Sequence, residues 1–140
     1  MTKMFMKGLS KNKKGFTLVE LMVVVVIIGI LTVIAVPVYK TSQEKAKENA
    51  HNANIRILKG AAAQYITDNG IPENGETWTE SNSDKWKNYL VTWPKNPGPA
   101  SLGQNKDKPY EVSISSDGTI TVTPDATNAN GNGNNQGNNQ

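Results

Sequence analysis

The sequence predicts an α+β fold in which a long N-terminal helix packs on a small C-terminal antiparallel sheet. Two observations support this prediction. An almost unbroken apolar run occupies residues 21–36, and apolar residues alternate with polar ones over residues 110–123. A long apolar run is typical of a membrane helix, and alternation with period two is typical of a half-buried strand. The 140 residues are therefore expected to hold at most one small domain beside a membrane segment.

Charge separates the first fifteen residues from the rest. Five lysines and no acidic residue lie in 1–15, and the remainder carries ten basic against twelve acidic groups. Basic residues beside an apolar segment favour the cytoplasmic face of a membrane. The pI near 9.1 is therefore weak evidence for nucleic-acid binding. Without cysteine the chain has no disulfide or thiol chemistry.

With its mostly apolar flanks, the apolar segment covers residues 16–39. As a helix it would measure about 36 Å, more than the roughly 30 Å hydrocarbon core of a bilayer. Its single charge is Glu20, and an ionisable group in such a segment is costly and by default functional. Two other interpretations remain, an ordinary single-span anchor and a secretory signal peptide cleaved after Ala35. Neither of them requires Glu20.

Residues 40–66 are predicted to continue the helix in amphipathic form. Small and apolar residues recur at steps of three or four, with charged residues between them. These positions are Ala46, Ala50, Ala53, Ile57 and Ala61, with Leu58, Ala62 and Tyr65 alongside. The helix is expected to end near Ile66, because Asn69, Gly70 and Pro72 follow.

Residues 67–124 are expected to form the globular part of the chain. A loop over 67–82 should lead to a short helix from Ser83 or Asp84 that ends before Pro94, although 91–93 could equally form a strand edge. Residues 94–109 contain four prolines and two glycines and predict an irregular loop.

The register of the hairpin at 110–123 follows from burial. Asp117-Gly118 marks the turn. A two-residue loop would put the apolar residues of the two strands on opposite faces, so we expect a three-residue loop with Gly118 in the left-handed conformation. That register pairs Ile114 with Ile120 and Val112 with Val122.

A lone hairpin is only marginally stable. We therefore expect its apolar face to lie on the helix stripe of Ile57, Ala61 and Tyr65, with a third strand as an option. The tract from Asn128 onward contains only Asn, Gly, Gln and Ala. Because it cannot bury enough apolar area to order itself, residues 125–140 are predicted to be a disordered tail.

The remaining polar and aromatic residues have structural interpretations. His51, the one histidine, has no partners at ligand spacing and is expected to be solvent-exposed. Asp107, Asp117 and Asp125 surround the hairpin without forming an EF-hand loop, and Asp117 fits turn chemistry better. The core, or a lid over the sheet, is expected to contain the tryptophans Trp78, Trp86 and Trp93. We find no catalytic triad, P-loop, Rossmann or zinc pattern, so no enzymatic activity, cofactor or metal is predicted.

The stretch KKGFTLVE at 13–20 resembles the processing signal of type IV pilin precursors, G-F-T-L-x-E between a short basic leader and an apolar segment. The resemblance is strong over residues 1–66 and holds only in outline beyond them. It implies a lollipop architecture. Its parts would be a leader at 1–15, a transmembrane and filament-core helix at 16–39, an amphipathic half at 40–66, a headgroup at 67–124 and a tail at 125–140.

The same resemblance implies roles for individual residues. Gly15 would be the last leader residue, cut from Phe16 on the cytoplasmic side by the prepilin peptidase, an integral-membrane aspartic protease. Phe16 would then carry the N-methylated terminus, and Glu20 would pair with that amine on a neighbouring subunit, as opposite charges attract strongly in an apolar core. Gly29 and Pro37 match the helix-breaking positions of the family, which implies an unwound stretch in the filament.

The implied function is that of a structural subunit and not an enzyme. The precursor would sit in membrane lipid, and the assembly machinery of the inner or cytoplasmic membrane would build a helical homo-oligomeric filament outside the cell. Adhesion, twitching motility or DNA uptake would follow, although no residue pattern supports a DNA contact. One alternative is a type II secretion major pseudopilin, which the Trp-Pro-x-Asn-Pro stretch at 93–97 and the hairpin favour. Another is a membrane-anchored or secreted binding module that uses the tryptophans.

Overall fold

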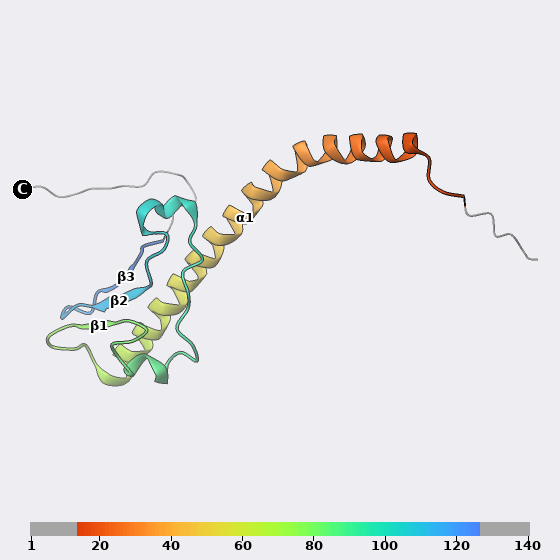
Figure 1. Ribbon diagram of the computed structural model, residues 1–140. Helices are drawn as coiled ribbons and strands as arrows, with labels where there is room; N and C mark the ends of the chain where they lie inside the picture. The colour runs from red at the N-terminus through yellow and green to blue at the C-terminus, as the bar shows by residue number, and fades with distance from the viewer. Residues whose placement is uncertain (1–13, 127–140) are drawn as a thin grey trace, which may run out of the picture. The chain divides into compact units, whose positions relative to one another are not determined.

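The computed structural model describes residues 14–126, which divide into two compact units, one ending at Tyr39 and the other beginning at Lys40. Helix α1 contributes to both units. The elements in chain order are α1 (Leu18–Asn69), β1 (Glu76–Trp78), the 3₁₀ helices η1 (Lys85–Asn88) and η2 (Ala100–Asn105), β2 (Glu111–Ile114) and β3 (Ile120–Thr123) (Figure 1). The predicted α+β class is confirmed. Most of the predicted leader and tail lies outside the described residues.

Helix α1 has a stop signal at its C-terminal end. Gly70 adopts a positive φ of 81°, and its N–H donates to the carbonyl of Ile66 at 2.8 Å. A residue in this left-handed conformation turns the chain out of the helix, and glycine is favoured there because it has no Cβ atom to strain. The helix therefore ends at Asn69, slightly later than the predicted Ile66.

The sheet has the strand order β1-β2-β3, with both pairs antiparallel. The predicted register is confirmed, since Val112 lies opposite Val122 and Ile114 opposite Ile120. Gly118 has a φ of 86° in the turn. The Asp117 carboxylate accepts the Thr119 N–H at 2.8 Å, which is turn chemistry as expected.

The third strand was predicted only as an option, and its residues lie in the segment expected to be a loop. Strand β1 is three residues long and pairs Trp78 with Val112 of β2. The short helix predicted after this loop is shorter than expected, because only the four residues of η1 are helical. Helix η2 lies within the predicted irregular loop.

The core of the second unit lies between α1 and one face of the sheet. All three tryptophans are buried, as predicted. The buried apolar residues are Ile55, Leu58, Ala61 and Ala62 of α1, the tryptophans Trp78, Trp86 and Trp93, and Tyr110, Val112, Ile114 and Val122.

The predicted packing stripe of α1 is partly wrong. Ile57 is 51% exposed, whereas Ile55 and Leu58 are buried. The buried residues follow helical steps of four, three and four from His51 through Ile55 and Leu58 to Ala62, so the buried stripe is centred one position beyond the predicted one. The true stripe also contains His51, which is fully buried and not solvent-exposed as expected.

Candidate processing and assembly site

The candidate site lies at the start of α1, where a capping box sets the first helical residue. The Thr17 hydroxyl accepts the Glu20 N–H at 3.2 Å, and Glu20 Oε2 accepts the Thr17 N–H at 2.8 Å. Each side chain thus satisfies a backbone donor that the first turn cannot pair. The helix begins at Leu18, so the Gly15–Phe16 peptide lies outside it. The prediction missed this cap, although its signal, Thr-x-x-Glu at 17–20, is present in the sequence.

Within residues 14–126, no contact requires glycine at position 15. A Cβ atom added there would meet nothing within 4 Å, and the residue is exposed. This exposure leaves Gly15 accessible to another molecule.

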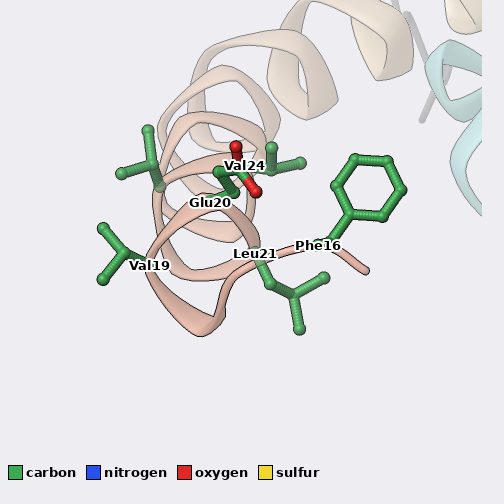
Figure 2. Close-up of a pocket in the computed structure, with 6 residues that line it drawn as sticks. Phe16, Val19, Glu20, Leu21 and Val24 are labelled. Carbon is green, nitrogen blue, oxygen red and sulfur yellow. The ribbon is translucent and has the colours of Figure 1, made fainter. Parts of the chain in front are cut away.

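Phe16 and Glu20 border the same hollow in the surface of the first helical turns. Its lining is almost entirely apolar and consists of Phe16, Val19, Glu20, Leu21, Val23 and Val24. Figure 2 shows the Phe16 ring standing clear of the first helical turn. Glu20 makes no ion pair within residues 14–126, so its charge is hydrogen-bonded but not neutralised there.

The rest of the helix up to Tyr39 presents apolar side chains on all sides. The exposure of the large apolar ones ranges from 44% at Val36 to 81% at Leu18. The segment is long and apolar enough to cross a membrane, and none of its most apolar window is buried within the chain. Thr32 adds no unpaired hydroxyl, because its Oγ1 donates to the Ile28 carbonyl at 2.7 Å. Lipid or another apolar chain must cover this surface.

Gly29 and Pro37 lie inside α1, and the helix is unbroken at both positions. Proline lacks an N–H, so the helix has no hydrogen bond donated from position 37. A Cβ atom at Gly29 would meet nothing within 4 Å. Their helix-breaking role concerns the assembled filament and stays a prediction.

The second unit contains a polar hub that sequence reasoning missed. The Glu76 carboxylate accepts hydrogen bonds from the Tyr65 hydroxyl at 2.8 Å, Trp78 Nε1 at 3.0 Å and Lys85 Nζ at 2.9 Å. Burial acts to raise the pKa of Glu76, but the three donors prevail and lower it. The hub joins α1, β1 and η1 through side chains that lie 2 to 11 residues from Glu76 in the sequence. Within residues 14–126 no cluster of three or more His, Cys, Asp or Glu side chains could hold a metal.

Comparison with known proteins points to the start of the chain and to one group of relatives. Residues 10–36 match the model of the prokaryotic N-terminal methylation motif. The chain is 38% identical over 89 residues to type II secretion system core protein G of Vibrio cholerae. The aligned region covers 64% of this chain and 56% of that protein. It is 39% identical over 85 residues to type IV major fimbrial protein FimA of Dichelobacter nodosus, with 57% and 51% covered.

A longer match is 29% identical over 118 residues to type IV major pilin protein PilE of Neisseria gonorrhoeae, covering 84% of this chain and 60% of that protein. The chain thus spans about half the length of the curated relatives that it matches. No solved structure matches it. The apolar helix and these relatives together support membrane anchoring.

Proposed function

We propose that the chain is a prepilin of the superfamily of type IV pilins and type II secretion pseudopilins, and that its mature form is the structural subunit of a type IV pilus. The observation that carries this proposal is the fully exposed apolar half of α1 with one unneutralised carboxylate at its start. Such a helix is stable in lipid, and it can leave lipid only by packing against an equally apolar surface. Copies of itself provide that surface.

Processing would occur at the Gly15–Phe16 peptide, on the cytoplasmic side of the cytoplasmic membrane. This bond lies outside the helix, which supports cleavage by a prepilin peptidase, because the peptide is not tied into the helical hydrogen-bond ladder. The exposed and unconstrained Gly15 supports recognition by an outside partner. Phe16 would then carry the methylated amine.

Assembly would pair Glu20 of one subunit with the Phe16 amine of a neighbour. Two opposite charges attract strongly in an apolar filament core, whereas either charge alone is costly to bury. The capping hydrogen bond from Thr17 uses Glu20 Oε2 without removing its charge. The pairing would set the axial register between subunits, and Gly29 and Pro37 would allow a local unwinding there.

The parts of the mature subunit would follow the sequence boundaries. We assign the leader to 1–15, the filament core to 16–39, the amphipathic helix to 40–66, the headgroup to 67–124 and the tail to 125–140. A pilus assembly machinery in the inner or cytoplasmic membrane would extrude the filament. Adhesion, twitching motility or DNA uptake would depend on the headgroup surface.

A second candidate is the major pseudopilin of a type II secretion system. It is favoured by the similarity to the Vibrio cholerae core protein G over 64% of the chain. Long surface fibres that disappear on deletion of the gene would support the pilus, and a secretion defect without visible fibres would support the pseudopilus.

Mass spectrometry of the N-terminus of the protein from its native host tests the proposal. We expect a chain that begins with N-methylated Phe16. A terminus at Met1 or Val36 would overturn it, because the first means no processing and the second means removal by signal peptidase. Cells that lack the prepilin peptidase serve as the control and should retain residues 1–15.

A further inference from the structure

The buried imidazole of His51 joins three parts of the second unit. Its Nδ1 lies 2.7 Å from the Tyr110 hydroxyl, and its Nε2 lies 2.7 Å from the carbonyl oxygen of Asp125. The ring also stacks on Tyr110, with centroids 5.5 Å apart and an interplanar angle of 19°. Tyr110 immediately precedes β2 and Asp125 follows β3. One α1 side chain therefore holds both open ends of the hairpin, which filament assembly does not explain.

The partners of the ring determine where its proton lies. The carbonyl of Asp125 can only accept, so Nε2 must carry the hydrogen. In a neutral ring Nδ1 then accepts, and the Tyr110 hydroxyl donates to it. Burial raises the pKa of the Tyr110 phenol, partly offset by a hydrogen bond with Asn54, so the phenol keeps the proton that it donates. The arrangement fits one protonation state of the imidazole.

A second ring proton would break this arrangement. Nδ1 would become a donor facing the Tyr110 hydroxyl, whose own proton would lose its acceptor, and a positive charge would be buried. No carboxylate hydrogen-bonds to the ring, whose two nitrogens are occupied by Tyr110 and the Asp125 carbonyl. The ionisable side chains on the neighbouring segments are Glu44, Lys47 and Glu48 on α1, Lys108 and Glu111 beside β2, and Asp125 after β3.

Glu48 is half-buried three residues before His51, and the other neighbours are engaged elsewhere or exposed. Glu44 pairs with Lys47 at 2.8 Å, and the Asp125 carboxylate accepts the Ala126 N–H at 2.7 Å. Lys108 and Glu111 are exposed. A charged imidazole would therefore face two neutral partners, the Tyr110 hydroxyl and the Asp125 carbonyl, with no carboxylate hydrogen-bonded to either nitrogen.

We propose that His51 is a pH-sensitive latch that holds the C-terminal end of the sheet on α1 while its ring is neutral and releases it when the ring takes a second proton. The released state binds one proton more than the latched state, so acidification favours release. Histidine is the side chain suited to such a switch, because it ordinarily changes charge near neutral pH. This role is independent of the filament proposal.

The test uses the full chain in detergent micelles, with NMR and amide hydrogen exchange recorded from pH 8 to pH 5. The chain has a single histidine, so every imidazole signal belongs to His51. We expect a neutral ring with its hydrogen on Nε2 at high pH. As release takes up the second ring proton on acidification, the amides of 120–126 should lose protection by up to about tenfold per pH unit after correction for intrinsic exchange.

Two variants complete the test. In His51→Gln the amides of 120–126 should exchange with no pH dependence beyond the intrinsic one, and the exposed Glu111→Gln variant should respond as the wild type does. A neutral ring with its hydrogen on Nδ1, protonation without loss of protection, or the same pH response in His51→Gln would each overturn the latch. If His51→Gln does not fold, the wild-type protein still tests the latch. Protonation of the ring and loss of protection at 120–126 must then occur over the same pH range.

Discussion

The two units of this chain use the same helix in opposite ways. Among the residues that the structure describes, α1 buries none of its side chains up to Tyr39, whereas from Lys40 onward it buries one stripe against the sheet. The first half is apolar on every side and its partners must be other molecules, while the second half is amphipathic and its partner is its own sheet. Changes in the first half are therefore expected to affect processing and assembly without unfolding the protein, and changes in the second half to affect stability.

The largest expected effect is at the proposed cleavage site. Gly15→Leu should abolish processing, because no contact within residues 14–126 requires a glycine there and the proposed peptidase would be the source of the requirement. The measurement is the mass of the mature chain. Gly29→Ala is the matched control, since a Cβ atom there also meets nothing within 4 Å, and it should be processed normally. A processed Gly15→Leu chain would contradict the assignment.

The second expected effect is loss of filaments from variants of Glu20. Glu20→Ala removes both charge and cap, whereas Glu20→Gln removes the charge and keeps an oxygen that can accept the Thr17 N–H. Both should be cleaved, and neither should assemble, if charge pairing is required. Electron microscopy of sheared filaments measures this. Normal filaments from Glu20→Gln but not from Glu20→Ala would assign the role to the cap instead.

A smaller effect should separate two neighbouring positions of the second half of α1. Leu58 is fully buried and Ile57 is half exposed. Leu58→Ala should lower the free energy of unfolding by roughly 2–5 kcal/mol, and Ile57→Ala by less than about 1 kcal/mol. Chemical denaturation of the detergent-solubilised chain checks the difference. Equal losses at both sites would show that the packing stripe is misplaced.

The smallest effect concerns Glu76 and pH. Its pKa is lowered in the folded state, so it contributes stability above its unfolded pKa that is lost as pH falls through the folded one. Glu76→Gln should cost about 1–3 kcal/mol near neutral pH and flatten the loss of stability on acidification. Unfolding curves at pH 7 and pH 3 measure both effects. The exposed Glu111→Gln variant is the control and should leave the pH dependence unchanged.

The sequence predicted best those features that local patterns determine. The hairpin register followed from placing Val112 opposite Val122, and it is confirmed. The roles that the motif assigns to Gly15, Phe16 and Glu20 stay predictions. Features that depend on distant partners were not predictable in this way. The partners of His51 lie 59 and 74 residues away along the chain, and the polar residues next to His51 in the sequence do not indicate them. Strand β1 is stable only because it pairs with the edge of β2.

The capping box affects how the precursor would become the mature subunit. Both of its hydrogen bonds join Thr17 to Glu20, on the same side of the Gly15–Phe16 bond. Loss of the basic leader would therefore leave the helix start intact. Precursor and mature subunit would share one folded beginning, and cleavage would add only a new positive terminus beside an already ordered turn. No refolding step would separate maturation from polymerisation.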